Sequence, residues 1–171
     1  MKKNNTEFLK ECMSNALVRL LKEKPLEKIS IIEITKKACV GRATWFRNFS
    51  SKEEALTYRI ITLWYIWCEK HNISQEQRYT VHNALDFFNF SLEYKDLYKL
   101  MYIRELQTTI YEAFYQVIIK QHRSSPSEYY KSRFLSYGVY GIVDEWVKRD
   151  FRESPEELAD ILYQTIKAAE T

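Results

Sequence analysis

Residues that form turns are scarce in this sequence, which contains only three glycines and three prolines among 171 residues. A fold rich in strands needs a turn about every eight to twelve residues, and such turns draw mainly on glycine and proline. Because so few are present, the chain must fill most of its length with long helices. We therefore predict an all-α fold.

Apolar residues recur at steps of three and four along most of the chain, as they do on the buried side of a helix. The first such stripe spans residues 6–24. Capping boxes, in which a serine precedes a glutamate by three residues, predict helix starts at Ser30, Ser51 and Ser154. The pattern over 97–117 fits either one bent helix or two. About nine helices are expected in all.

Three of the expected helices lie within the first fifty residues, with a tight turn at 39–41 between the second and the third. This arrangement is typical of a helix-turn-helix, whose second helix enters the major groove of DNA. We expect Val40, Trp45 and Phe49 to face inward and hold the third helix against the first two. The outward residues, which carry donors suited to base edges or phosphates, are Arg42, Thr44, Arg47 and Asn48.

Charge is distributed unevenly along the chain. Residues 1–52 contain twelve Lys and Arg against five Asp and Glu, a balance of +7, whereas residues 53–171 contain fourteen against eighteen, a balance of −4. A basic N-terminal segment favours binding to a polyanion. The same asymmetry also suits an acidic protein partner, so charge by itself leaves the choice of partner open.

The stretch LEKISIIEITKKACVGRATWFRNFSSKEEAL, residues 26–56, resembles the signature of the TetR family of transcriptional regulators. The matching features are a β-branched run before the second helix, Ala-x-Val from Ala38, Thr-aromatic-aromatic-x-x-Phe from Thr44, and the Ser-Lys-Glu-Glu run that follows. The resemblance implies a helix-turn-helix DNA-binding domain over residues 1–52. It also implies a helical regulatory and dimerisation domain over residues 53–171.

The same resemblance assigns roles in DNA binding. Arg42 reads a base edge, most naturally guanine O6 and N7, while Thr44 and Asn48 hold phosphates. Lys52 pairs with a phosphate at the start of the fourth helix. The predicted DNA-binding set is Ser30, Gly41, Arg42, Ala43, Thr44, Phe46, Arg47, Asn48 and Lys52. A homodimeric repressor that binds a palindromic operator in double-stranded DNA is the expected function.

Three positions depart from the family pattern. Gly41 stands where a serine or threonine usually caps the recognition helix, so its side chain cannot act as a cap. Phe46 stands where a tyrosine hydroxyl commonly bonds phosphate, and Ile32 stands where a polar or basic residue often reaches DNA. The alternative is therefore a TetR-like co-regulator that has lost specific DNA binding and acts through a protein partner.

Aromatic residues concentrate in residues 53–171, which hold 22 of the 26 Phe, Trp and Tyr. Aromatic residues at helical spacing usually form core, and that interpretation stays open here. Their number also suits a largely apolar pocket with a few hydroxyl and indole N–H groups. We predict a small apolar or aromatic inducer that releases the repressor from DNA. Its predicted contacts are Trp64, Trp67, Phe87, Phe88, Tyr102, Tyr111 and Phe114.

The last two expected helices carry the predicted dimer interface. Gly138 and Gly141 lack side chains and permit close approach of another helix, either from the same chain or from a second copy. The segment 137–159 also resembles the ending of a TetR branch that includes activators of dihydroxyacetone-kinase operons, and in the family these helices dimerise. The predicted interface residues are Gly138, Gly141, Ile142, Trp146, Leu158, Ile161, Leu162 and Ile166.

Other classes of function find no support in the sequence. It has no glycine-rich phosphate loop and no nucleophile in a known catalytic context, so no enzymatic activity is expected. Its cysteines, Cys12, Cys39 and Cys68, lack metal-ligand spacing, so neither a metal nor another cofactor is expected. The chain contains no apolar run of about eighteen residues and no apolar signal segment near its first residues, so we expect a cytoplasmic protein without membrane contact.

Overall fold

The computed structural model describes residues 5–74, 83–119 and 125–168, and over these ranges it contains nine α-helices, one 3-10 helix and no strand. The predicted all-α fold is confirmed. The elements are α1 (Asn5–Glu23), η1 (Leu26–Lys28), α2 (Ile31–Lys37), α3 (Arg42–Asn48), α4 (Lys52–Lys70), α5 (Ala84–Glu93), α6 (Lys95–Ile103), α7 (Gln107–Ile119), α8 (Pro126–Lys148) and α9 (Pro155–Ala168). No helix in the described ranges is both long and apolar enough to cross a membrane.

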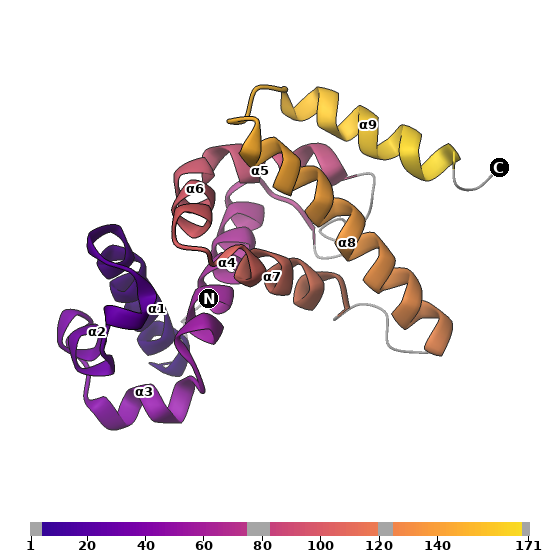
Figure 1. Ribbon diagram of the computed structural model, residues 1–171. Coiled ribbons are helices and arrows are strands. Elements are labelled where there is room, and N and C mark those ends of the chain that lie inside the picture. The colour runs from indigo at the N-terminus through magenta and orange to yellow at the C-terminus, as the bar shows by residue number, and fades with distance from the viewer. Residues whose placement is uncertain (1–4, 75–82, 120–124, 169–171) are drawn as a thin grey trace.

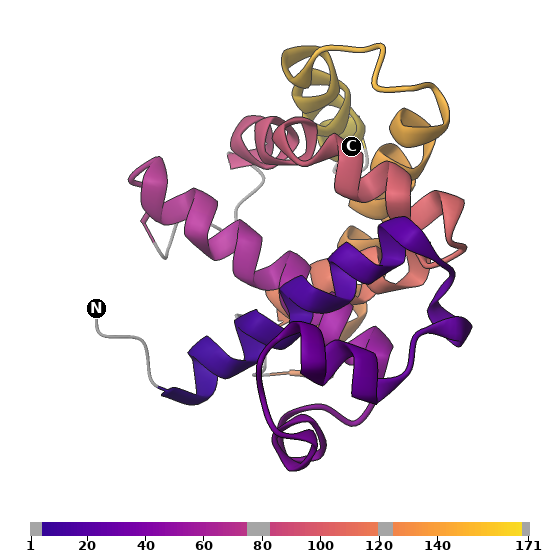
Figure 2. The ribbon, with the colours of Figure 1, turned by 90° about the vertical axis from the view of Figure 1, so that its left-hand side faces the viewer.

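The helices form two groups joined by α4. Helices α1, α2 and α3 gather at one end of the molecule, and α8 and α9 lie on the side away from them (Figure 1). Helix α4 crosses α1 (Figure 2) and also packs against α7. In the body, α7 also packs against α8, and α5 packs against α9. The long fourth helix therefore connects the N-terminal group to the middle of the body.

The core is continuous across the two groups. One cluster of buried side chains extends from Met13 in α1 to Leu162 in α9. A smaller cluster surrounds Trp64 and Trp67 near the C-terminal end of α4. The domain boundary predicted between residues 52 and 53 falls at the start of α4, whose first buried residues belong to the same cluster as those of α1. The division into two domains therefore stays a prediction.

Serine caps start several of the helices, as the sequence predicts. At α2, the Ser30 hydroxyl accepts a hydrogen bond from the Glu33 N–H, and the Glu33 carboxylate accepts one from the Ser30 N–H at 2.9 Å. The same pair of bonds forms between Ser154 and Glu157 before α9. Each box satisfies two backbone N–H groups that have no partner inside the helix.

Two other helix starts differ from the prediction. At α4, the Ser51 hydroxyl accepts from the Glu54 N–H, but the Glu54 carboxylate accepts from the N–H of Ser50 instead of Ser51. Helix α8 begins at Pro126 with a complete capping box between Ser125 and Glu128, which is not among the capping boxes that the sequence analysis names. The Ser-Pro-x-Glu pattern of residues 125–128 is the same pattern that precedes α9, so it also indicates a helix start.

Four helices end in the left-handed conformation without using glycine. At these ends Cys39, Asn72, Glu105 and Asp150 adopt positive φ, between 55° and 62°, and Phe151, which follows Asp150, also has a positive φ of 58°. After each of the first four, the next residue donates its N–H to the carbonyl five positions earlier, at 2.8 to 3.0 Å. This bond defines a Schellman motif, and the donors Val40, Ile73, Leu106 and Phe151 are all apolar. The motif at Glu105 separates α6 from α7, so the segment 97–117 contains two helices.

Candidate functional site

The turn between α2 and α3 positions the predicted recognition helix. Cys39 reverses the chain at φ 55°, and the Val40 N–H donates to the Thr35 carbonyl at 3.0 Å. Gly41 is the N-cap of α3, with an extended backbone and no side-chain cap. A Cβ atom at this position would meet only the Thr44 hydroxyl, at 3.9 Å. The fold therefore accepts a side chain at Gly41, and α3 begins without the cap that a serine would supply.

Two buried aromatic side chains hold α3 against the other helices. The rings of Trp45 and Phe49 are 5.2 Å apart, and Phe49 meets the ring of Tyr58 on α4 edge-on at 5.7 Å. The Lys10 ammonium of α1 lies 4.4 Å from the centre of the Tyr58 ring. Val40 packs against the same core. These residues face inward as the sequence predicts, so the opposite side of α3 faces solvent.

The outer side of α3 carries hydrogen-bond donors. Its exposed residues are Arg42, Ala43, Phe46 and Arg47, and its half-buried residues are Thr44 and Asn48. The Arg47 Nε donates to the Ala43 carbonyl at 3.3 Å, and the Asn48 amide donates to the Thr44 carbonyl at 2.7 Å. Both side chains keep further N–H groups. This surface can therefore donate to phosphates and to base edges.

Two further members of the predicted DNA-binding set, Ser30 and Lys52, have partners within the protein. The Ser30 hydroxyl takes part in the capping box of α2. The Lys52 ammonium donates to the carbonyl oxygens of Leu26 at 2.6 Å and Ile29 at 3.0 Å, which ties η1 to the start of α4. An ammonium group has three N–H bonds, so one remains for a phosphate. A phosphate contact from Lys52 stays a prediction.

Ion pairs attach α2 to the end of α1. The Glu33 carboxylate pairs with Lys24 and also accepts hydrogen bonds from Ser30. The Lys24 contact, followed by the bonds from Ser30, lowers the pKa of Glu33 to about 2. A second pair joins Lys37 to Glu23 at 2.9 Å. At neutral pH, ionised Glu33 therefore helps to fix the helix that precedes the recognition turn.

Five of the seven predicted ligand contacts form one aromatic cluster in the body. Trp64 and Trp67 on α4 stack with ring centres 5.8 Å apart, and Phe87 on α5 meets Trp64 edge-on at 6.0 Å. Phe87 also lies 4.9 Å from Phe114 and 5.5 Å from Phe88. All of these rings except Phe87 are buried. The cluster therefore contributes to the core, in agreement with the simpler interpretation of the aromatic residues.

The two indole groups of this cluster differ in their polar contacts. Trp67 Nε1 donates to the Glu93 carboxylate at 2.9 Å. Trp64 Nε1 is buried and has no hydrogen-bond partner in the described part of the chain. A buried N–H without a partner costs about 1–3 kcal/mol, so such a group marks a place where an acceptor would stabilise the protein.

The other two predicted ligand contacts lie elsewhere. The Tyr102 hydroxyl donates to the Asp144 carboxylate on α8 at 2.6 Å, and burial, followed by this bond, raises the pKa of Tyr102. The Tyr111 ring stacks on Tyr137 at 4.4 Å, and its hydroxyl accepts from Arg133. Both tyrosines thus join the body helices to α8.

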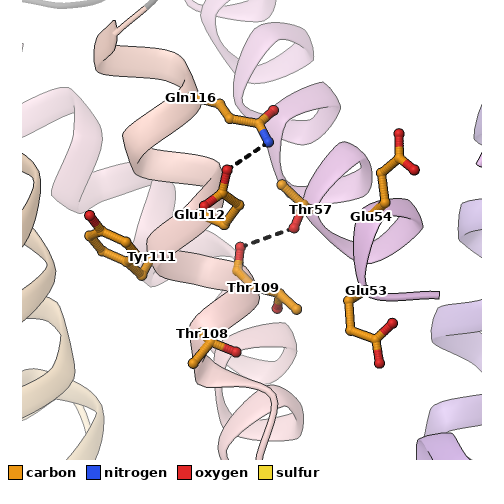
Figure 3. Close-up of a pocket in the computed structure, with 8 residues that line it drawn as sticks. All are labelled: Glu53, Glu54, Thr57, Thr108, Thr109, Tyr111, Glu112 and Gln116. Atoms are coloured by element: carbon orange, nitrogen blue, oxygen red, sulfur yellow. Dashed lines mark hydrogen bonds between the residues drawn. The ribbon is translucent and has the colours of Figure 1, made fainter. Parts of the chain in front are cut away.

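An open pocket of about 380 Å³ lies between the start of α4 and α7 (Figure 3). Its lining residues are Glu53, Glu54, Thr57, Thr108, Thr109, Tyr111, Glu112 and Gln116. Glu53 and Glu54 point away from α7, and Tyr111 extends to the far side of α7 from α4 (Figure 3). Only Tyr111 belongs to the predicted ligand set. The predicted tryptophan and phenylalanine contacts therefore do not line this pocket, and its carboxylates do not converge on one point.

The predicted interface residues differ in how exposed their side chains are in the protomer. Gly138, Gly141 and Ile161 are exposed, Ile142 and Ile166 are half-buried, and Trp146, Leu158 and Leu162 are buried. The Trp146 indole donates to the Glu153 carbonyl at 3.0 Å, and its ring packs on Phe151 at 4.8 Å. Trp146, Leu158 and Leu162 therefore belong to the core of the protomer, because packing within the chain already covers them.

The exposed face of α8 carries three aromatic residues that the sequence analysis missed. Tyr130, Phe134 and Tyr137 lie on one side of the helix, and Tyr130 and Phe134 are 80% and 76% exposed. Gly138 and Gly141 continue the same face, and a Cβ at either glycine would contact nothing within 4 Å. The packing of the protomer therefore does not require glycine at these positions. The spacing of the aromatic residues, by four and then three, is visible in the sequence.

The N-terminal helices have the arrangement of a helix-turn-helix regulator, with α3 held on its inner side and polar on its outer side. Residues 82–168 match a TetR family model described as "Transcriptional regulator C-terminal region". The chain belongs to the TetR family of transcriptional regulators.

A solved TetR transcriptional regulator from Rhodococcus sp. RHA1 shares the fold. Its TM-score to this chain is 0.57 at 16% sequence identity, and the match covers 90% of this chain and 91% of that one. No curated protein matches the chain. The resemblance to the branch of dihydroxyacetone-kinase activators stays a prediction.

Proposed function

We propose that this protein represses transcription by binding an inverted-repeat operator through α3. The observation that carries the proposal is the outer face of α3, which is exposed, rich in donors and fixed from behind by Trp45 and Phe49. The guanidinium of Arg42 donates no hydrogen bond within the described part of the chain, so it is available to a guanine edge. The balance of +7 over residues 1–52 complements the phosphate backbone.

Gel shifts with DNA flanking the gene test this proposal. We expect one protected inverted repeat and an affinity that falls steeply as salt rises. Arg42→Ala should cost about 1–3 kcal/mol and relax the preference at one base pair in each half-site. A reporter placed behind the protected site then distinguishes repression from activation. Binding without any preferred sequence would contradict the proposal.

A homodimer is the proposed DNA-binding form. A single helix-turn-helix covers one half-site, and a two-fold dimer places two such helices about one turn of DNA apart. The exposed aromatic face of α8 supports this assembly, because contiguous exposed aromatic groups are typical of interfaces. Gly138 and Gly141 leave room on that face for a second helix. Light scattering tests the proposal, with a mass of about twice 20.6 kDa as the expected result.

A small apolar or aromatic ligand is proposed to release the operator. The Trp64 indole N–H, which has no partner among the described residues, supports a ligand that carries a hydrogen-bond acceptor beside its apolar part. Phe87, which is half-buried against Trp64, offers apolar contact beside that donor. Tryptophan fluorescence during a screen of acceptor-bearing aromatic compounds tests the idea. A true inducer should shift the emission of the wild type, weaken operator binding, and do neither in Trp64→Phe.

The second candidate function is a co-regulator that acts through a protein partner without specific DNA binding. The exposed apolar side chains of Ile32 and Phe46 and the uncapped start of α3 favour it, because they reduce the number of phosphate contacts. Selection of duplexes from a random-sequence pool separates the two functions. An enriched motif supports the repressor, and the absence of enrichment supports the co-regulator.

A further inference from the structure

We propose that Phe46 is a specificity-determining residue, whose ring packs on the C5-methyl group of a thymine close to the guanine that Arg42 reads. The inference rests on the proposed DNA binding. It adds a thymine to the guanine that Arg42 is proposed to read. It follows from the position of one exposed aromatic ring on the face of α3 that also carries Arg42 and Arg47.

Phe46 has no role in holding α3 in place. Its neighbour Trp45 is buried and packs against Phe49, whereas the side chain of Phe46 is 61% exposed. The guanidinium of Arg42 lies 5.7 Å from the centre of its ring. The ring therefore lies on the outer face of α3, beside the base-reading residue.

The chemistry of the ring limits what it can read. A phenyl group neither donates nor accepts a conventional hydrogen bond, so it cannot pair with the N7, O6, N6 or N4 groups of the major groove. The C5-methyl of thymine is the apolar group on the base edges of that groove, and apolar side chains including Phe contact it. The basic charge around α3 makes duplex DNA the occupant that complements this face.

The helical spacing sets the distance between the two bases. Residues four apart on a helix are separated by about 6 Å along its axis. Successive base pairs of B-DNA are about 3.4 Å apart. A guanine read by Arg42 and a thymine touched by Phe46 should therefore lie one or two base-pair steps apart. The contact between guanidinium and ring keeps the two side chains together before DNA binds.

Replacement of thymine by deoxyuridine tests the inference, since it removes only the methyl group. The probe is a duplex that the wild-type protein selects from a random-sequence pool, with each thymine of both half-sites replaced in turn. We expect one thymine in each half-site at which the replacement weakens binding. Each such replacement should lower the affinity about fourfold, because it removes one buried methyl group. Phe46→Ala should bind the original duplex more weakly and be indifferent to that replacement.

Two matched variants separate base reading from general weakening. Phe46→Leu keeps an apolar side chain and should remain sensitive to loss of the methyl group. Arg47→Ala, on the same face, should lower the affinity for every duplex and leave the sensitivity intact. The inference is overturned if the wild type prefers a sequence yet tolerates deoxyuridine at every thymine, or if Phe46→Ala stays sensitive. Failure to select any sequence instead overturns the proposed function, and this inference with it.

Discussion

Arg104, just beyond the end of α6, donates a hydrogen bond from its Nε to the carbonyl oxygen of Leu21 in the last turn of α1, at 2.8 Å. A second guanidinium nitrogen donates to the Lys22 carbonyl at 3.3 Å. The Leu21 carbonyl has no partner within the helix, because the residue four positions on is Pro25, which has no N–H. A side chain of the body thus caps the first helix of the N-terminal group.

Removal of this cap should destabilise the protein. We expect Arg104→Ala to lower the free energy of unfolding by about 1–3 kcal/mol, because it deletes a charged donor and leaves the carbonyl oxygens unsatisfied. Urea unfolding followed by circular dichroism measures the change. Arg152→Ala removes an exposed arginine and should stay within about 0.5 kcal/mol of the wild type. Equal values for the two variants would show that the cap contributes nothing.

Glycine at position 105 should stabilise the protein. Glu105 is exposed and adopts φ 58°, a conformation that costs an L-residue about 1–2 kcal/mol and costs glycine little. Glu105→Gly should therefore raise the thermal midpoint, by an amount equivalent to about 1 kcal/mol. Glu105→Ala removes the same carboxylate and keeps the strain, so it should give no increase. A gain in both variants would assign the effect to the side chain instead.

The four left-handed helix ends show why helix starts were easier to predict than helix ends. A helix start depends on a local hydrogen bond such as that between Ser30 and Glu33, so sequence spacing reveals it. The turn at 39–41 is predicted, whereas the ends at Asn72, Glu105 and Asp150 lack the glycine that normally marks such ends. Their signal is the apolar residue that follows each one, which is recognised only once its burial is known.

The candidate sites also differ in whether a local pattern or the packing of distant helices defines them. The outer face of α3 could be predicted because Trp45 and Phe49 define its inner side within a few residues. The ligand and interface sets depend on how distant helices pack, which no local spacing determines. Tyr102 therefore pairs with Asp144 on α8 instead of joining the aromatic cluster, and Trp146 is covered by its own chain.

The contribution of Glu33 to stability should depend on pH. Its pKa is lowered from 4.5 to about 2, so the stabilisation is fully present above pH 4.5 and is lost as the pH falls from 4.5 towards 2. The difference in thermal midpoint between the wild type and Glu33→Gln should therefore be constant near neutral pH and shrink below pH 4.5. Lys24→Met removes the largest cause of the shift and should move the loss to higher pH. A difference that is independent of pH would contradict this role of the ion pair.

A charge on the exposed face of α8 should separate the proposed dimer into monomers. In a two-fold interface each copy contributes the same face, so Phe134→Glu places two carboxylates in one contact, where they repel each other and lose solvation. Phe134 is exposed in the protomer, so the variant should keep its helical content while sedimenting as a monomer and binding the operator weakly. Phe8→Glu makes the same change at a 55% exposed position on α1 and should remain dimeric. If Phe134→Glu stays dimeric, the subunits associate through a surface other than the aromatic face of α8.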